Sequence, residues 1–257
     1  MSVFISGASS GIGAACARAF GAAGKELVLV ARRKDRVQAL ARDVAKAHGV
    51  QVHAFQLDVR DRKAVESFIE EHAGLLSAVE VLVNNAGLAA GLSAIQAGNV
   101  DEWERMIDTN LKGLLYVSRG LLPKLIEKSA RGGNCHVVNI GSVAGRWTYP
   151  NGNVYCATKF GVRALSESMR LDLHGTGIRV TEIAPGMAET EFSEVRLGDK
   201  EKAKAVYAGM RPLSAEDVAE TVLWCVGRPK HVNIQELVVF PTDQSSVTLV
   251  KRAEAKA

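Results

Sequence analysis

Three side chains in the middle of the chain belong to types that move a proton to or from an oxygen atom. Tyr155 and Lys159 are four residues apart in a helix-forming stretch, so both side chains fall on one helix face. Bringing the pKa of a phenol from near 10 toward neutrality takes about 4 kcal/mol, and an ammonium about 4 Å away at an effective dielectric near 20 supplies about that amount. Ser142, thirteen residues before Tyr155 and just after an apolar run, adds a hydroxyl that can hold the reacting oxygen. Together the three residues predict proton transfer at an alcohol or a carbonyl.

A glycine-rich stretch near the start of the chain predicts a phosphate-binding turn. It reads SGASSGIG from Ser6 to Gly13 and lies between an apolar run and a helix-like segment. Glycines let backbone N–H groups approach an anion closely, and the start of a helix adds a partial positive charge. The spacing, G-x-x-x-G-x-G, differs from the general dinucleotide fingerprint. The residues expected at the phosphates are Gly7, Ser9, Ser10, Gly11, Ile12 and Gly13.

Short apolar runs alternate with longer amphipathic stretches, and these predict the elements that position the site. The expected strands are 3–6, 27–31, 50–57, 79–84, 135–140, 178–184 and 237–240. The expected helices are 13–23, 35–48, 61–72, 101–128, 154–174 and 215–225. Strands that are apolar on both faces and alternate with helices are typical of a parallel sheet with right-handed crossovers. We therefore expect one α/β domain over 1–257, with a doubly wound, Rossmann-type parallel sheet flanked by helices.

Two irregular stretches and one proline complete this outline. The polar segment 186–213 separates the sixth strand from the last helix, which favours a substrate lid. The tail 244–257 either covers the site or joins a neighbouring molecule. Pro123 is expected to break or kink the helix that begins near Asp101.

Composition indicates a globular protein and argues against several classes of partner. The 257 residues are 47% hydrophobic and 23% charged, which is enough for a core without disulfides. The net charge of +4 is too small to indicate nucleic acid or an anionic membrane as a partner. No secretory signal and no apolar run of membrane-spanning length is visible. Four widely spaced cysteines and six histidines lack metal-ligand spacing, so we expect reduced thiols, no metal and a cytoplasmic location.

Further motifs follow the glycine turn in a fixed order along the chain. They are Asn84-Asn85-Ala86-Gly87, Asn110, Ser142, Tyr155-Cys156-Ala157-Thr158-Lys159 and Pro185-Gly186. With the glycine turn, this ordered set resembles the short-chain dehydrogenase/reductase family over essentially the whole chain. One small departure is Ser6, where the family usually has Thr; the hydroxyl is kept.

The resemblance implies roles for residues that spacing alone does not assign. It places Asp58 and Val59 by the adenine of a dinucleotide cofactor, Asn85 near the adenosine ribose, Thr190 near the nicotinamide carboxamide, and Gly87, Pro185 and Gly186 in the same cofactor site. It gives Lys159 a second task, holding the nicotinamide ribose, and Asn110 a part in a proton relay through water. Taken alone, Asn110 is better interpreted as a structural residue inside a helix.

The end of the second strand favours NADP over NAD as the cofactor. An NAD site carries an Asp or Glu there to hold the ribose 2′-hydroxyl. This chain has Arg32 and Arg33 instead, and no acid before Asp35. Two guanidinium groups can bind a 2′-phosphate through charge-assisted hydrogen bonds, with Ser9 expected to assist. The alternative is that both arginines simply solvate a strand end.

A finer resemblance concerns the substrate. The runs NLKG at 110–113, GNVY at 152–155, DLHGT at 172–176, TEFS at 190–193 and HVNI at 231–234 are similar to the NADP-dependent 3-hydroxy acid dehydrogenases. Their substrates are small hydroxy acids or semialdehydes that carry an anionic group, so a cation is needed near Tyr155. Arg196 is the first candidate for that cation and Arg146 the second. The segment between Gly186 and Thr190 is one residue shorter than in the subgroup.

The leading interpretation is an NADP(H)-dependent oxidoreductase that interconverts the CH–OH and C=O groups of a small polar hydroxy acid or semialdehyde. Two other functions remain open at this stage. The first alternative, a sulfoacetaldehyde reductase or broad carbonyl reductase, changes the substrate. The second, a non-catalytic NADPH-binding module, changes the class of protein. An intact Ser142, Tyr155 and Lys159 argue against the module. By resemblance we expect a homotetramer paired through the two long helices and the last strand.

Overall fold

A seven-stranded sheet forms the centre of the computed structural model, which describes residues 1–253 of the chain. All its neighbouring strands are parallel, in the order β3-β2-β1-β4-β5-β6-β7. The strands are β1 (Ser2–Ser6), β2 (Glu26–Ala31), β3 (Val52–Gln56), β4 (Val79–Asn84), β5 (His136–Ile140), β6 (Arg179–Pro185) and β7 (Glu236–Val239). β1, β5 and β6 are buried at every position, as is typical of a parallel sheet covered on both faces, and β6 buries the charged Arg179 and Glu182 among its apolar residues. The predicted doubly wound sheet is confirmed.

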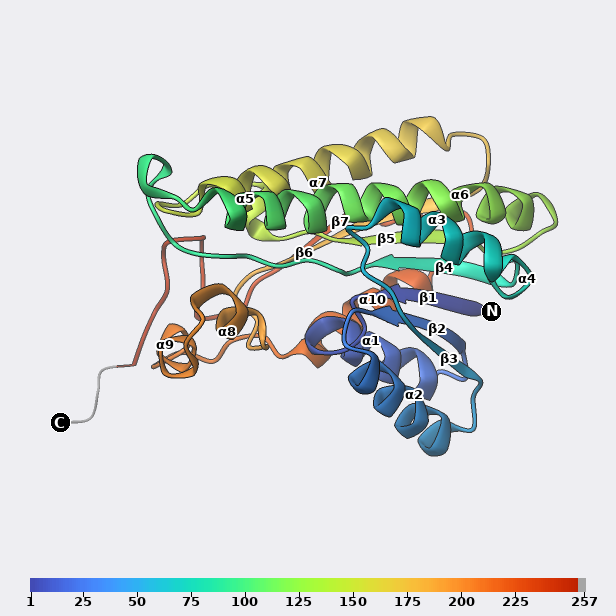
Figure 1. Cartoon of the computed structure of the whole chain (residues 1–257), viewed down its shortest axis with the longest axis horizontal. Helices are drawn as coiled ribbons and strands as arrows, with labels where there is room; N and C mark the ends of the chain where they lie inside the picture. Colours follow the sequence, from blue (N-terminus) through green and yellow to red (C-terminus); the bar gives the residue numbers. More distant parts are fainter. Residues whose placement is uncertain (254–257) are drawn as a thin grey trace.

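Helices cover both faces of the sheet. The longer ones are α1 (Gly11–Ala22), α2 (Lys34–His48), α3 (Arg62–Glu71), α5 (Val100–Ile107), α6 (Leu114–Ala130), α7 (Asn153–Asp172) and α10 (Ala215–Val226). The short ones are α4 (Ala73–Leu76), α8 (Phe192–Leu197) and α9 (Lys200–Val206), with the 3-10 turns η1 (Ile95–Ala97) and η3 (Val143–Gly145). In Figure 1, α3, α5, α6 and α7 lie above the sheet and α1 and α2 below it, with α10 packed against α1. The short α4 lies at the right-hand end of β4, and α8 and α9 project at the opposite end.

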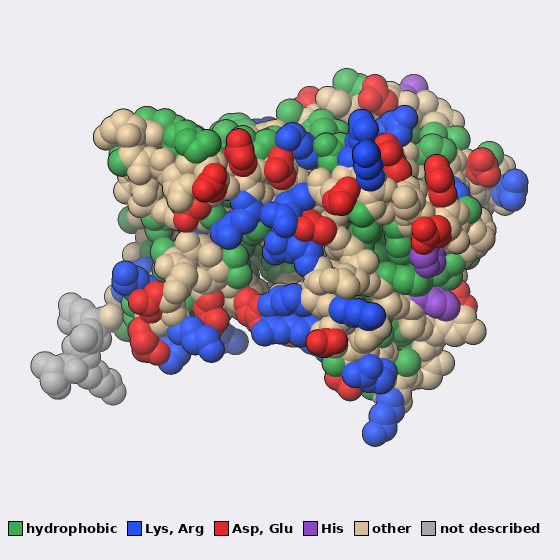
Figure 2. All heavy atoms as spheres, in the orientation of Figure 1, with side chains coloured by type: hydrophobic (Ala, Val, Ile, Leu, Met, Phe, Trp, Pro, Cys, Tyr) green, Lys and Arg blue, Asp and Glu red, His purple; other side chains and the backbone are tan. Residues whose placement is uncertain are grey.

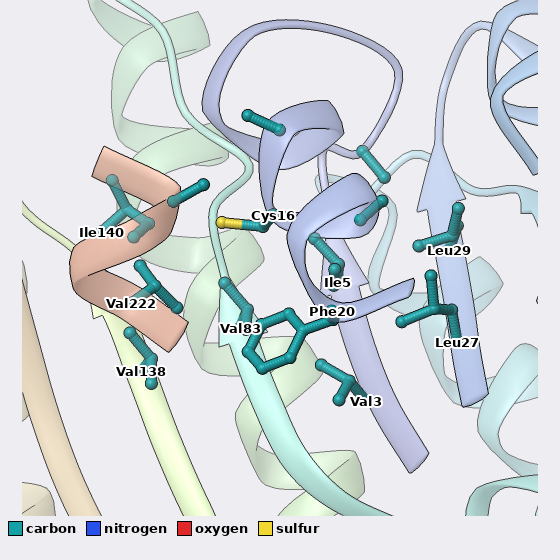
Figure 3. Close-up of a cluster of buried hydrophobic side chains, with 14 of the residues drawn as sticks. Val3, Ile5, Cys16, Phe20, Leu27, Leu29, Val83, Val138, Ile140 and Val222 are labelled. Atoms are coloured by element: carbon teal, nitrogen blue, oxygen red, sulfur yellow. The ribbon is translucent and has the colours of Figure 1, made fainter. Parts of the chain in front are cut away.

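The core beneath the sheet fixes α1, and with it the glycine turn. Phe20 of α1 is fully buried, and Figure 3 shows its ring between Val83 of β4 and Val3 of β1. Val222 of α10 lies in the same cluster, so α1 is packed against both the sheet and α10. Since α1 cannot shift without opening this core, the turn at its start keeps a fixed place at the carboxyl end of β1.

The long helix above the sheet contains Pro123. The chain runs through α5, the π-helical turn η2 (Asp108–Gly113) and α6, and Pro123 lies inside α6. The helix is therefore not broken at Pro123, although a break was one of the two outcomes expected there. Pro123 and Arg119, the residue whose carbonyl it leaves without a donor, are both exposed, so water can hydrogen-bond that carbonyl.

The segment after β6 and the tail pack against each other at the carboxyl edge of the sheet. The segment contains α8 and α9, and the Ala253 amide in the tail donates to the Gly209 carbonyl just beyond α9. Residues 254–257 of the predicted tail lie outside the described residues. Within 1–253, no helix combines the length and the apolar character needed to cross a membrane.

Candidate active site

A cavity of about 500 Å³ opens where the carboxyl ends of the strands meet. The strand order reverses between β1 and β4, which is where an open α/β sheet leaves a crevice for a ligand. Figure 2 shows a hollow in this face of the molecule, bordered by Lys and Arg side chains. Every site residue expected from the sequence lines this cavity except Gly13, Asn110 and Arg146.

The glycine turn at one end of the cavity has the shape of an anion cradle. Gly7 and Gly11 have φ of +67° and +52°, the left-handed region that glycine adopts at no steric cost. A Cβ on Gly7 would lie 2.7 Å from the Ala86 Cα, and one on Gly13 would strike the Asn85 amide. Gly13 is thus required for packing, beneath the turn rather than in its lining. The amide of Asn85 donates to the carbonyls of Ser6 and Gly7, so it holds the turn in shape.

Arg33 ties the end of β2 to this turn. Its Nη2 donates to the Ser10 hydroxyl at 2.6 Å and its Nε to the Ser9 hydroxyl at 3.2 Å. Ser10 precedes α1 and makes no side-chain cap to it, so the first backbone N–H groups of the helix keep their capacity for an anion. Arg32 lines the cavity beside Arg33. Glycines in the left-handed region, an uncapped helix start and two guanidinium groups together fit the phosphates of an NADP molecule.

The predicted adenine end is built from the loop after β3. Asp58 forms a bidentate ion pair with Arg60, with a closest N–O distance of 2.6 Å. Burial alone would raise the pKa of Asp58, but the hydrogen bonds from Arg60 hold it below its ordinary value. Val59 is buried against Gly113 of the π-helical turn, where a Cβ would lie 2.6 Å from its Cγ2.

At the other end of the cavity, α7 presents Tyr155 and Lys159 on one face. Both are nearly buried, with exposed fractions of 8% and 6%. The Lys159 Nζ lies 5.9 Å from the centre of the Tyr155 ring and donates to the Ile140 carbonyl at 2.8 Å. Ser142 follows β5 and its hydroxyl accepts from the Ala144 amide. The three residues predicted for proton transfer therefore meet in one cavity.

The electrostatics of this group correct one expectation. Burial raises the pKa of Tyr155 above its ordinary value, while the hydrogen bond with Ser142 acts in the opposite direction. Burial also lowers the pKa of Lys159, to about 8, and the nearby charge of Glu182 opposes this shift. Lys159 by itself does not make the phenol acidic, because its ammonium is partly desolvated and is directed to Ile140. The chain alone holds Tyr155 as a neutral phenol.

Asn110 lies behind the cavity rather than in its lining. It is buried in the π-helical turn, its Oδ1 accepts from the Leu88 amide, and its Nδ2 donates to the Leu88 carbonyl and the Thr158 hydroxyl. Both amide protons are therefore used to hold the loop after β4 and α7 together. The structural interpretation of its side chain, preferred from the sequence alone, agrees with this geometry.

Arg146 is not placed to bind a substrate. Its side chain is 8% exposed and pairs with the fully buried Glu182 at 3.1 Å and with Glu236 at 2.8 Å. A buried carboxylate requires a partner of opposite charge, and this requirement turns Arg146 away from the cavity and into the sheet. The expectation that Arg146 is a second candidate anchor is therefore wrong.

Arg196 of α8 is the cation beside Tyr155. Its guanidinium carbon lies 5.6 Å from the centre of the Tyr155 ring and 5.4 Å from that of Tyr149. The Nε atom donates to the Gly91 carbonyl at 3.4 Å, and the side chain is part of the cavity lining. A carboxylate or sulfonate on a substrate held at Tyr155 would meet this group.

Several lining residues carried no signal in the sequence. Tyr149 supports Arg196, and the ring of Phe192 lies 5.5 Å from that of Tyr155. The Gln244 side chain accepts from the Met187 amide at 2.8 Å and so joins the tail to the cavity wall. Each reaches the cavity by a loop or short helix, where no periodicity marks an inward-facing position.

A crevice that fits a dinucleotide, with a Ser, a Tyr and a Lys at one end, is typical of the dinucleotide-dependent oxidoreductases. The similarity of the sequence to known families leads to the same class of protein. A model described as short chain dehydrogenase matches residues 1–201. The chain belongs to the short-chain dehydrogenase family, as its motifs indicated.

Individual proteins that are similar to this chain belong to a smaller group within the family. The chain is 48% identical to sulfoacetaldehyde reductase 2 of Chromohalobacter salexigens over 244 residues, 95% of each protein. It is 45% identical to the NADP-dependent 3-hydroxy acid dehydrogenase YdfG of Salmonella typhi over 247 residues, 95% of this chain and 96% of that protein. Among solved structures, the closed form of serine dehydrogenase complexed with NADP+ aligns with a TM-score of 0.90 and 42% identity, covering 99% of this chain and all of that one.

Proposed function

We propose that this chain is an NADP(H)-dependent oxidoreductase that interconverts the CH–OH and C=O groups of a small anionic hydroxy acid or semialdehyde. The observation that carries the proposal is the position of Arg196, a cation 5.6 Å from the ring of the proton-transferring Tyr155. Relatives named for 3-hydroxy acids and for sulfoacetaldehyde, both anionic substrates, support it.

The residues present fit the proposed cofactor. The glycine turn and the start of α1 would hold its pyrophosphate, Arg32 and Arg33 its 2′-phosphate, and Asp58 with Val59 would border its adenine. Lys159 would hold the nicotinamide ribose, and Thr190 would lie near the carboxamide. When bound, NADP(H) supplies or accepts the hydride.

The chain itself handles the proton and the developing charge. Tyr155 is a neutral phenol at neutral pH, and in the direction of reduction its hydroxyl donates a proton to the substrate oxygen. The Ser142 hydroxyl donates a hydrogen bond to the same oxygen as negative charge grows on it. Lys159 keeps a positive charge beside the phenolate that remains, which lowers the free energy of that state.

Arg196 sets the distance between the anion and the reacting carbon. The resemblance to the 3-hydroxy acid dehydrogenases implies a substrate whose anionic group is two or three atoms from the reacting carbon, and Arg196 beside Tyr155 is placed to bind that group. A sulfonate would fit the same cation, so sulfoacetaldehyde is the second candidate substrate, favoured by the 48% identical relative. Segment 186–213, which carries Arg196, is proposed as the substrate lid of a single domain over 1–257.

The test compares substrates of opposite character in one variant. In Arg196→Ala, we expect KM for an anionic semialdehyde to rise about 10- to 100-fold, because a charge-assisted contact worth about 1.5–3 kcal/mol is lost. KM for a neutral aldehyde of similar size should change less than about twofold. The measurement is NADPH oxidation at saturating cofactor, with malonic semialdehyde and sulfoacetaldehyde as the anionic substrates.

The control is Arg170→Ala, an arginine on α7 that is bonded to the Gln235 carbonyl and lies outside the cavity lining. Its KM values should match those of the parent chain. Equal losses for anionic and neutral substrates in Arg196→Ala would contradict the anchor and favour a broad carbonyl reductase.

We further propose a cytoplasmic homotetramer. Its support is the set of large apolar side chains that α6, α7 and β7 leave exposed: Leu115, Ile126, Phe160, Leu171 and Val238. The four cysteines are buried and free, which is consistent with a reducing compartment.

A further inference from the structure

A carboxylate from the segment after β6 lies between two guanidinium groups at the cofactor site. Glu191 pairs with the Arg33 Nη1 at 2.8 Å and with the Arg36 Nη1 at 2.5 Å, one carboxylate oxygen to each arginine. Glu191 comes from the loop between β6 and α8, whereas Arg33 and Arg36 come from the end of β2 and the start of α2. The contact therefore crosses the mouth of the cavity.

The two arginines form a site whose charge suits a phosphate better than a carboxylate. A phosphate monoester carries about −1.5 to −2 charges at neutral pH, whereas Glu191 carries one. The other Arg33 nitrogens are held by Ser9 and Ser10, so its guanidinium keeps its orientation whichever anion occupies Nη1. Arg33, which lines the cavity, can thus accept either Glu191 or the 2′-phosphate at Nη1.

The ion pairs of Glu191 with Arg33 and Arg36 are exposed to solvent, so they can break and re-form more easily than an ion pair in the core. The side chains of Arg33, Arg36 and Glu191 are 42%, 53% and 37% exposed, and pairs with this exposure add little to stability. Although burial alone would raise the pKa of Glu191, the hydrogen bonds from Arg33 and Arg36 hold it below its ordinary value. Glu191 is therefore a charged competitor at neutral pH.

We propose that Glu191, which Arg36 also holds, is a specificity-determining residue that competes with the cofactor 2′-phosphate for Arg33 and is displaced when NADP(H) binds. The inference rests on the proposed role of Arg33 at the 2′-phosphate. By this competition Glu191 lowers the affinity of the site for the 2′-phosphate. The cofactor then dissociates more readily, because Glu191 replaces the phosphate as the partner of the arginine.

Binding of two adenosine fragments tests this without turnover. Titration calorimetry on the full chain measures Kd for 2′,5′-ADP, which carries the phosphate, and for 5′-AMP, which lacks it. In Glu191→Gln, which keeps the shape and removes the charge, we expect Kd for 2′,5′-ADP to fall about three- to tenfold. Kd for 5′-AMP should stay within about twofold. Glu194→Gln is the matched control, an exposed acid on α8 without an ion pair in residues 1–253; both constants should stay unchanged.

Three results would overturn the proposal. An unchanged Kd for 2′,5′-ADP in Glu191→Gln would show that Glu191 does not compete with the phosphate. A higher Kd would show instead that Glu191 positions the arginines for binding. An equal gain for 5′-AMP places its effect away from the phosphate. Failure of the underlying assignment is recognised separately, because the parent chain would then bind 2′,5′-ADP no more tightly than 5′-AMP. Thermal melting of each variant without ligand confirms that it is folded.

Discussion

Tyr155 is the residue on which the proposed chemistry depends. The phenol is 8% exposed, and burial raises its pKa above the ordinary value. It is therefore neutral at neutral pH, and proton transfer in either direction requires positive charge beside it to stabilise the phenolate form. To accept a proton from an alcohol, Tyr155 needs more positive charge than Lys159 provides in the structure.

Removal of this hydroxyl gives a direct prediction. In Tyr155→Phe, kcat should fall at least 100-fold, since general acid catalysis typically contributes about 10²- to 10⁴-fold. The NADPH dissociation constant, measured by fluorescence titration, should stay within a few-fold. Tyr116→Phe, on α6 and outside the cavity lining, is the matched control and should keep full activity. Retention of more than a few per cent of kcat in Tyr155→Phe would contradict the assignment.

At the scale of elements, an ion-pair network joins the loop after β5 to β6 and β7. Arg146 follows η3, the turn that Ser142 caps, and pairs with Glu182 of β6 and Glu236 of β7. Glu182 also lies against Gly141, where no side chain would fit. The network therefore fixes the loop that carries Ser142, which gives Arg146 a structural role in place of the expected contact with substrate.

Arg146→Ala should destabilise the fold, because it leaves a fully buried Glu182 without its partner. We expect the free energy of unfolding to fall by about 3–5 kcal/mol, measured by urea denaturation. Arg163→Ala is the comparison, since that arginine also pairs with Glu236 but is 42% exposed; its loss should be about 1 kcal/mol or less. A rise in KM for anionic substrates at unchanged stability would instead restore Arg146 as an anchor.

For the whole molecule, the faces that the fold leaves apolar bear on assembly. Leu171 on α7 is 74% exposed, and Leu115, Ile126 and Phe160 are exposed on α6 and α7. Apolar side chains gathered on one pair of long helices are typical of an interface. This layer lies on the far side of the sheet from α1 and α10 (Figure 1).

Light scattering should therefore report a tetramer, and Leu171→Asp should shift it toward smaller species, because a charge in an apolar interface is costly. Leu249→Asp changes a side chain of similar exposure, 65%, in the tail and serves as the control. A tetramer unaffected by Leu171→Asp would mean that this end of α7 is not in the interface, and a monomeric parent chain would contradict the proposal.

Local patterns in the sequence were sufficient to predict the fold, the glycine turn and the positions of Tyr155 and Lys159. Apolar runs predicted each strand to within two residues. Burial on both faces explains this for the inner strands, whereas the outer strands β3 and β7 are only partly buried and were marked by their β-branched and aromatic residues. Tyr155 and Lys159 were found by their helical spacing, and the glycine turn by the backbone conformations it requires. That the helix continues through Pro123 could not be predicted, because its exposure on α6 is not visible in the sequence.

The sequence by itself determined the features that depend on residues close together in the chain. These are the doubly wound sheet, the predicted phosphate turn, and the predicted group of Ser142, Tyr155 and Lys159. Only the tertiary structure decided which arginine lines the cavity. It also decided that the Asn110 side-chain amide forms hydrogen bonds with the Leu88 backbone, and that Glu191 forms ion pairs with Arg33 and Arg36. These contacts join residues far apart in sequence, and each depends on burial and on competition between partners, which no local spacing encodes.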